Sequence, residues 1–266
     1  MSLKDDVLKT MDELYLIGQI QDDGSIEGGD SINRMSHYHF TIQANKKIGN
    51  GALVEQLPFN TQKRFEEDLE LFECPDSKGN YRRHPTNGWA SFCGGTYDGN
   101  MSRDQSFPLI IAMAFMGLYK RLGMYFIRHL MRGFLFTNNT RKNGKDPDKT
   151  PWKLPDFTGP EFFSVYLRAI PALGYILYPV LCILDLELLG SAFVWSKFRK
   201  DDDDIVNFCD SLIFANMRVR TPVSYLATKL VSKDLIINKL KSHWEGWRQS
   251  GYFVNLYQPL IERFVK

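Results

Sequence analysis

A run of ten apolar residues, from Phe107 to Met116, directly follows a glycine-rich polar segment at residues 94–105. A continuous apolar run of this length has to be buried, so it predicts a helix in the core of the protein. The polar segment before it brings together two carboxylates, a guanidinium, a phenol and two amides. Loops that lead into rigid elements commonly carry function, so this junction constrains the fold and is also a candidate site.

Apolar residues recur at helical spacing along most of the chain. Val7, Met11 and Leu14 begin this pattern, and Thr221-Pro222 and Ser232 are typical of helix starts. A strand is an alternative for residues 38–42. The fold class predicted by this spacing is all-α. The predicted helices cover about residues 3–20, 31–46, 60–73, 104–121, 123–137 and 254–265, with a break near Gly123.

Two long segments interrupt the predicted helices. Residues 75–100 and 138–160 are rich in Gly, Asn, Pro and Ser, and we expect them to be irregular. Loops of this length in a compact domain are commonly functional. We therefore expect a toroid-like array of helical hairpins, with its long loops on one face.

The length and the charge limit the classes of function. The 266 residues fit one large domain or two small ones, and we expect a single helical domain over residues 1–266. The formal net charge of +2, from 33 basic and 31 acidic residues, gives no electrostatic reason to expect a nucleic-acid partner. No cofactor is expected, and the oligomeric state is left open.

The cysteines and the first residues of the chain favour a cytoplasmic protein. Cys74, Cys93, Cys182 and Cys209 include no CxxC pair, which removes the spacing that a zinc site needs. We expect reduced thiols, with Cys182 buried as a small apolar side chain. The first residues contain no apolar signal core. The acids at 201–204 precede an apolar helical pattern, so we interpret them as favourable charges at a helix start and expect no metal.

The apolar run at residues 170–184 has two interpretations. It is shorter than the ~20 residues that span a bilayer, and extending it brings in Asp185 and Glu187. We therefore expect buried core helices here and no membrane partner. A membrane-associated protein that uses residues 162–195 is the alternative.

Three clusters of ionisable residues lie in the first half of the chain. The first surrounds Asp30 in a glycine-rich loop, and the second places Arg34 and His37 on one helical face, away from His39. His37 is either a structural histidine or an acid, a base or a substrate contact. His84 lies in a basic stretch and is expected to be solvated. The third cluster, in the polar segment before the apolar run, contains Tyr97, Asp98, Arg103, Asp104 and Gln105.

The start of the buried helix can be placed in two ways. Ser102 and Gln105 have the spacing of a capping box, which would begin the helix at Arg103. Pro108 would then lie inside the helix, where its ring clashes with the preceding turn. With Ser106 as the cap, Pro108 lies in the first turn and the clash is removed. We therefore expect the helix to begin at Ser106, with Arg103 and the two residues after it in the loop.

The stretch 101–105, followed by residues 108–112, resembles a pattern in the (α/α) toroid proteins, the six-hairpin glycosidase-like group. In that group an Arg-Asp-Gln or similar triplet opens an inward-facing helix at the mouth of a barrel. The loop from Gly28 to Arg34 resembles an earlier loop of such proteins, which include uncharacterised phage and bacterial members. The resemblance covers about residues 20–120 and implies a helical barrel with a polar, aromatic-lined mouth. Complete toroids are usually longer, so it implies a compact or incomplete one.

The resemblance implies a carbohydrate-active enzyme, because many members cleave glycosidic bonds with two carboxylates. On the matching positions, Asp104 and Asp98 are the candidate acid and base of a hydrolase, with Asp30 as an alternative partner. A lyase would need a Tyr or His base and an arginine that neutralises the substrate. A non-catalytic structural or interaction protein of phage or bacterial origin is the alternative, and it predicts that the same residues form a closed ion-pair network with no cavity. The candidate contacts to carbohydrate or another polar small molecule are Arg34, His37, Tyr97, Arg103, Gln105 and Trp89.

Overall fold

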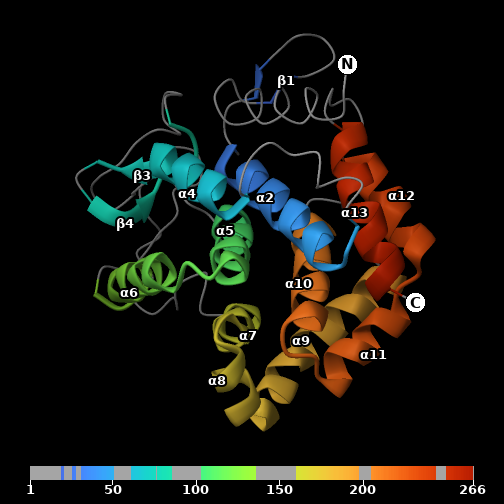
Figure 1. The fold of residues 1–266 in the computed structure, drawn as a ribbon. Coiled ribbons are helices and arrows are strands. Elements are labelled where there is room, and N and C mark those ends of the chain that lie inside the picture. Colours follow the sequence, from blue (N-terminus) through green and yellow to red (C-terminus); the bar gives the residue numbers. More distant parts are fainter. Residues whose placement is uncertain are drawn as a thin grey trace.

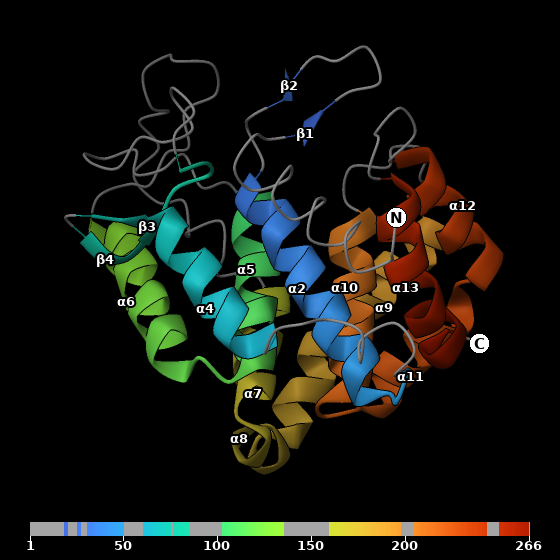
Figure 2. The same cartoon turned by 45° about the horizontal axis from the view of Figure 1, so that its top comes forward.

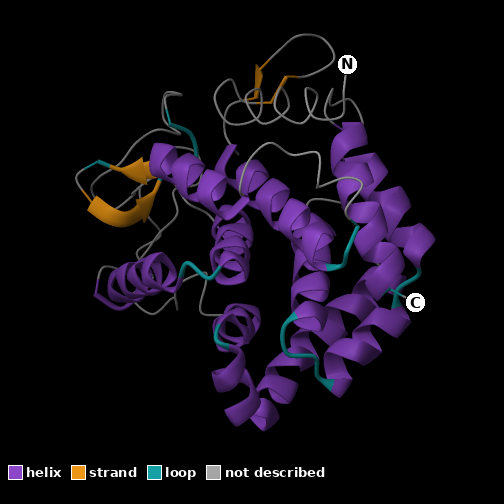
Figure 3. Ribbon diagram, viewed as in Figure 1, coloured by secondary structure: helices purple, strands orange, loops and turns teal. Residues whose placement is uncertain are grey.

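The structure is a computed structural model that describes residues 19–20, 26–27, 31–50, 61–75, 77–85, 103–135, 160–197, 205–243 and 250–265. Most of these residues are helical, which confirms the all-α prediction (Figure 1, Figure 3). The strands described form two antiparallel pairs, β1 (Gln19–Ile20) with β2 (Ile26–Glu27), and β3 (Glu73–Cys74) with β4 (Ser77–Tyr81). The helices are α2 (Ser31–Lys47), α4 (Thr61–Phe72), α5 (Arg103–Met116), α6 (Tyr119–Leu135), α7 (Pro160–Ala169), α8 (Pro171–Ile176), α9 (Tyr178–Lys197), α10 (Ile205–Met217), α11 (Pro222–Leu230), α12 (Lys233–His243) and α13 (Ser250–Phe264).

Five helices contact one another in a closed series that follows their order along the chain. In this series α2 contacts α5, α5 contacts α7, α7 contacts α10, α10 contacts α13, and α13 contacts α2. The other long helices lie against the series, with α4 on α2, α6 on α5, α9 on α7 and α12 on α13. Figure 2 shows α2, α5 and α10 in the middle, between α4 and α6 on one side and α12 and α13 on the other.

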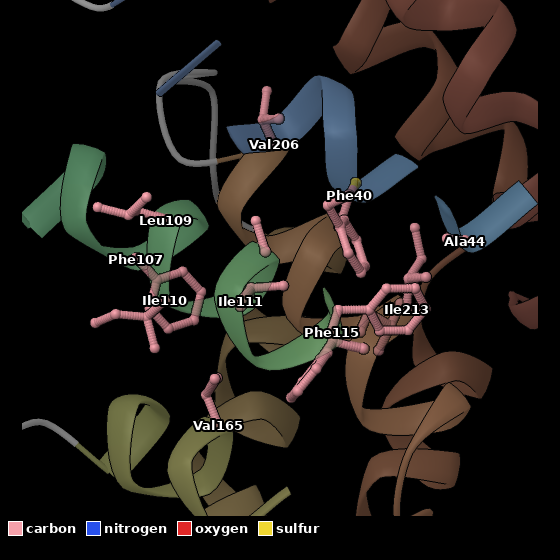
Figure 4. Close-up of a cluster of buried hydrophobic side chains, with 14 of the residues drawn as sticks. Phe40, Ala44, Phe107, Leu109, Ile110, Ile111, Phe115, Val165, Val206 and Ile213 are labelled. Atoms are coloured by element: carbon pink, nitrogen blue, oxygen red, sulfur yellow. The ribbon is translucent and has the colours of Figure 1, made fainter. Parts of the chain in front are cut away.

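The centre of the core lies where α2, α5 and α10 meet. Phe40, Phe115 and Phe214 contribute one ring from each helix, with centroids 5.0, 6.1 and 6.5 Å apart. Every residue from Ser106 to Met116 is buried, as the apolar run predicted (Figure 4). A helix that is hydrophobic all round is stable only when it is surrounded, and α2, α6, α7 and α10, which all contact α5, supply that environment.

The ends of the three central helices lie together. The ammonium of Lys47, the last residue of α2, lies 4.0 Å from the centroid of the Phe115 ring. Arg218, which follows α10, donates from Nη2 to the carbonyl oxygens of Ala114 and Phe115 at 2.7 and 3.0 Å. Because α2, α5 and α10 all end at this point, the three helices run in the same direction.

The starts of α2 and α5 lie together at the opposite end. The backbone N–H of Ile32 donates to the carbonyl oxygen of Arg83 at 3.0 Å. The rings of Tyr81 and Tyr125 are 5.5 Å apart, and the Tyr125 hydroxyl donates to the Ser106 hydroxyl at 2.8 Å. The end of β4 therefore connects the first turn of α2 to the first turns of α5.

Several predicted helix boundaries are confirmed. Residues 31–47 form a helix, so the strand alternative for residues 38–42 is wrong. Thr221 caps α11 in a capping box with Ser224, and the Ser232 hydroxyl accepts from the Leu235 N–H at 3.1 Å at the start of α12. Residues 61–72 and 250–264 form the predicted acidic helix and the last helix, the latter beginning earlier than expected.

The break between α5 and α6 was predicted at the wrong glycine. It lies at Gly117, whose φ of +78° is the left-handed conformation that commonly ends a helix. The Leu118 N–H donates to the carbonyl oxygen of Met113 at 2.9 Å, which satisfies an exposed carbonyl at the end of α5. Gly123 lies inside α6 instead.

The predicted start of α5 at Ser106 is also wrong. The helix begins at Arg103, directly after Ser102, so Pro108 lies inside it and residues 103–105 are helical. An internal proline costs up to about 3 kcal/mol, mainly because it lacks an N–H and its ring crowds the preceding turn. Burial of the whole apolar run offsets that cost.

Four further expectations need correction. Gln19–Ile20 are a strand, although a helix was predicted up to residue 20, and β4 lies within the predicted irregular segment 75–100. His84 is buried, with 2% of its surface exposed, because it packs beside the start of α2 rather than in solvent. Cys74 is disulfide-bonded, so the expectation of reduced thiols is wrong for this residue, whereas Cys182 and Cys209 are free.

Candidate functional site

The predicted site residues are only partly within the described structure. Asp30, Trp89, Tyr97 and Asp98 lie outside the described residues, as do residues 201–204. The triplet Arg103, Asp104 and Gln105 forms the first turn of α5, and its side chains lie outside the described part. Arg34 and His37 are both on α2 and both buried, with 8% and 2% of their surface exposed.

His37 belongs to a buried group of three side chains from three helices. Its Nδ1 lies 2.6 Å from Oδ2 of Asp210 on α10. The hydroxyl of Tyr257 on α13 donates to the other carboxylate oxygen of Asp210 at 2.5 Å, and lies 3.3 Å from His37 Nδ1. Asp210 therefore accepts from both neighbours and connects α2, α10 and α13 at the middle of the closed series.

The surroundings of Asp210 disfavour its charge. Burial raises the pKa of Asp210, and the adjacent His37 and the Tyr257 hydroxyl oppose that rise. Burial and the nearby Asp210 carboxylate raise the pKa of Tyr257 well above its ordinary value, so the phenol stays protonated and remains a donor. The pKa of Cys209, next to Asp210 in the chain, is also raised by burial, which keeps this thiol protonated.

This arrangement has a defined chemical consequence for His37. A carboxylate accepts hydrogen bonds, so the pairing with Asp210 assigns the ring hydrogen to Nδ1 and leaves the lone pair on Nε2. A histidine oriented in this way is a competent base, and the same contacts also hold a purely structural histidine in place. The geometry is compatible with both interpretations of His37.

His39 faces the opposite side of α2, as predicted from helical spacing. Its Nε2 lies 2.7 Å from Oδ2 of Asp68 on α4, and Asp68 also pairs through Oδ1 with Nε of Arg64 at 2.8 Å. Burial lowers the pKa of His39, although the Asp68 carboxylate opposes that shift. Burial therefore favours the neutral form of His39, the nearby Arg64 adds to that effect, and the histidine links α2 to α4.

A third buried group joins α7, α9 and the start of α11. Arg168 donates from Nη2 to Asp185 Oδ2 at 2.6 Å and from Nε to the Val219 carbonyl oxygen at 3.0 Å. The hydroxyl of Thr221 donates to the same carboxylate oxygen, and Ser164 bridges Arg168 and Asp185. Both charges are almost completely buried, so this group is a closed network. It is formed by residues other than the candidate site residues, for which the structural alternative predicted such a network.

The partners of these histidines and arginines were missed in the sequence. Asp210 stands alone in an apolar helical run, and a lone carboxylate in such a run indicates a buried partner; Asp185 shares its apolar run with Glu187. The signal at Asp210 identifies the carboxylate but not the residues that pair with it, since Asp210 and His37 are 173 positions apart. Among the described residues, no group of three or more His, Cys, Asp or Glu side chains is placed to hold a metal ion.

Comparison of the chain with protein-family models, with curated proteins and with solved structures finds no match.

Proposed function

We propose that the chain is a compact (α/α) toroid-like protein that acts on carbohydrate, as a glycoside hydrolase or a polysaccharide lyase. The observation that carries this proposal is the shared direction of α2, α5 and α10, whose ends meet around Phe115. Their starts therefore lie at one end of the molecule. The closed series of five helices, alternating along the chain with helices that surround it, is the second observation in favour of a toroid-like arrangement.

Two candidate carboxylates are joined to the starts of α2 and α5, which run in the same direction. The chain therefore brings them toward the same end of the molecule. Asp30 immediately precedes Ser31 at the start of α2, and Asp104 is the second residue of α5. Asp98 is five residues before Arg103, so it lies at most ~17 Å from that helix start. The starts of helices also carry a positive partial charge, which favours carboxylates and anionic sugars at this end.

The proposed chemistry uses two carboxyl groups. Asp104 donates a proton to the leaving glycosidic oxygen, and Asp98 or Asp30 activates water or attacks the anomeric carbon. In a lyase reaction, a base removes the proton next to the uronate carboxylate while Arg34 or Arg103 neutralises that carboxylate. A double bond then forms as the neighbouring carbon loses its bond to the glycosidic oxygen, which leaves as a hydroxyl after taking a proton from water. His37, oriented by Asp210, is the candidate base from the described part of the chain.

A non-catalytic structural or interaction protein is the second candidate. The saturated networks around Arg168 and Asp210 favour it, because each buried charge is already satisfied by the protein's own groups.

The cytoplasmic location remains a prediction, and the disulfide at Cys74 weighs against it because disulfides persist mainly in oxidising compartments.

Turnover of a panel of neutral oligosaccharides and polyuronates tests the proposal. Wild type is expected to release products from at least one class, and Asp104→Asn to lose about 100-fold or more of that rate. Asp234→Asn, at an exposed acid in the first turn of α12, is the matched control and is expected to keep full activity. Equal turnover in wild type and Asp104→Asn, or none in either, would remove the proposal.

A further inference from the structure

Helix α9 is apolar on two opposite faces. Its buried face consists of Leu181, Asp185, Ala192 and Trp195, which pack toward the protein. The exposed face is also apolar, and Ile183 and Leu186 keep 66% and 55% of their surface exposed. The expectation that residues 170–184 form buried core helices is therefore wrong. A surface helix of a soluble protein normally carries polar residues on its outer face.

The exposed apolar face continues along α8 and the end of α7. We call this surface the α8–α9 face. Gly190 lies within it, and nothing approaches within 4 Å of the position where a Cβ atom would stand. The apolar residues of the α8–α9 face are Ile170, Leu173, Tyr175, Ile176, Val180, Ile183, Leu186, Phe193 and Val194, each with more than a third of its surface exposed.

The α8–α9 face is larger than the apolar patches that soluble monomers ordinarily expose. The exposed fractions correspond to on the order of 1,000 Å² of surface, whereas the largest apolar patch on a typical monomer is about 300–600 Å². Among the described helices, α9 is also the one that is long and apolar enough to cross a membrane. Both observations indicate an apolar environment on the outer side of this face.

The buried side of α9 determines how it can meet that environment. Asp185 is held by Arg168 from α7 and by Thr221 at the start of α11. The Tyr178 hydroxyl donates to the Arg220 carbonyl oxygen at 3.2 Å and fastens the first turn of α9 to the same segment. Withdrawing α9 from the protein would leave Arg168 as an uncompensated buried charge, which is strongly unfavourable. The helix therefore meets an apolar phase along its length, from one side only.

Cations lie beside the α8–α9 face. Lys197 ends α9, and Arg220 and Lys229 are exposed and lie over the Tyr225 ring, at 3.9 and 5.1 Å from its centroid. Of the two acids on α9, Asp185 is buried in its own network and Glu187 is partly exposed. An apolar centre with lysine and arginine at its edge matches the chemistry of an anionic bilayer surface.

We propose that the α8–α9 face docks onto the surface of an anionic lipid bilayer, with α9 lying in the plane of the interface. Tyr175, 63% exposed at the edge, is an amphipathic side chain of the kind that is enriched at the headgroup level. This inference is independent of the proposed carbohydrate chemistry, and it replaces the expectation of no membrane partner.

Sedimentation with lipid vesicles tests the docking surface. Full-length protein is mixed with phosphatidylcholine vesicles, with or without phosphatidylglycerol. Wild type is expected to bind the vesicles that contain phosphatidylglycerol, and less so as NaCl is raised. Ile183→Ser/Leu186→Ser is expected to lose at least about tenfold of that binding, since both side chains would leave the acyl region. Lys197→Gln/Lys229→Gln is expected to reduce only the binding that depends on phosphatidylglycerol.

The matched control is Ile127→Ser/Leu71→Ser, which changes an isoleucine that is 58% exposed and a leucine that is 42% exposed on α6 and α4. This variant is expected to bind vesicles as wild type does, and circular dichroism verifies that all variants fold. The proposal is overturned if wild type binds neither kind of vesicle. It is also overturned if Ile183→Ser/Leu186→Ser binds vesicles as strongly as the control Ile127→Ser/Leu71→Ser does. Light scattering that shows a dimer converted to monomer by Ile183→Ser/Leu186→Ser, without vesicle binding, would assign the face to a second copy instead.

Discussion

Arg168 and Asp185 form a buried ion pair, with Nη2 2.6 Å from Oδ2, that holds α9 against α7. The surrounding hydroxyls of Ser164 and Thr221 satisfy the remaining groups. Such a pair contributes little net stability compared with apolar residues of the same shape, but breaking it leaves a charge without compensation. The pair therefore determines where α9 sits, and with it the orientation of the α8–α9 face.

Removing one member of this pair is expected to cost more than removing both. Arg168→Met leaves Asp185 buried without its cation and should lower the free energy of unfolding by about 3–5 kcal/mol. Arg168→Met combined with Asp185→Leu should recover part of that loss, because no unpaired charge remains. Urea denaturation of wild type, both single variants and the double variant completes the cycle. Additive losses would show that the two side chains do not act as a pair.

Substitution by alanine is expected to lower stability by different amounts at two glycines that have a positive φ. At Gly79, φ is +81° and a Cβ atom would lie 2.9 Å from Cβ of Met124, so backbone strain and a clash both apply. At Gly117, φ is +78° and the nearest atoms are 3.8 Å away, so only the strain applies. Gly117→Ala should cost about 1–2 kcal/mol and Gly79→Ala clearly more, as measured by thermal or urea unfolding. Equal costs would contradict the close approach at Gly79.

At Gly190, substitution by alanine is expected to stabilise the protein rather than destabilise it. This glycine lies within α9, and a Cβ atom there would contact nothing within 4 Å. Gly190→Ala should therefore raise the free energy of unfolding by up to about 1 kcal/mol, because alanine restricts the unfolded chain and favours the helix. The measurement is the urea midpoint of the lipid-free protein. A loss of stability would mean that another group packs closely on this face.

His39 predicts a dependence of stability on pH. Burial holds its folded pKa below the ordinary 6.5, so the unfolded chain binds a proton that the folded chain does not accept as the pH falls. The stability it contributes is present above pH 6.5 and is lost as the pH falls through the folded pKa.

The matched comparison is His39→Gln, whose amide can still donate to Asp68 but does not titrate. Unfolding free energies at pH 7.5, 6.5 and 5.5 should fall more steeply in wild type, by up to ~1.4 kcal/mol per pH unit. His84, whose pKa is also lowered by burial, is present in both proteins and cancels. Parallel pH profiles would contradict a depressed pKa at His39.

Local patterns predicted the helices better than the contacts between them. The sequence predicts the helix at Ser31–Lys47 and the helix start at Thr221-Pro222, and both are confirmed, because helical periodicity and capping act over a few residues. The predicted start of α5 at Ser106 is wrong because the sequence shows the cost of an internal Pro108 but not the free energy gained by burying α5. That gain depends on helices distant in the sequence.

The buried networks depend on the same long-range information. His37 was identified as a residue of interest from its neighbours on α2, but Asp210 and Tyr257 reach it from α10 and α13. The apolar run at residues 170–184 was assigned to the core because hydrophobicity alone predicts burial, whereas the exposure of α9 depends on which helices surround it. The sequence identifies residue types, and the packing decides which surface each one meets.

The proposed function requires the loops joined to α2 and α5 to bring two carboxylates together at one end of the molecule. A crystal structure of the whole chain with an oligosaccharide bound measures this directly, as the distance between the carboxyl groups of Asp104 and of Asp98 or Asp30. One pair is expected at about 5–10 Å on either side of a glycosidic bond. Separations well beyond ~10 Å for both pairs, or a sugar bound elsewhere, would contradict the proposed function.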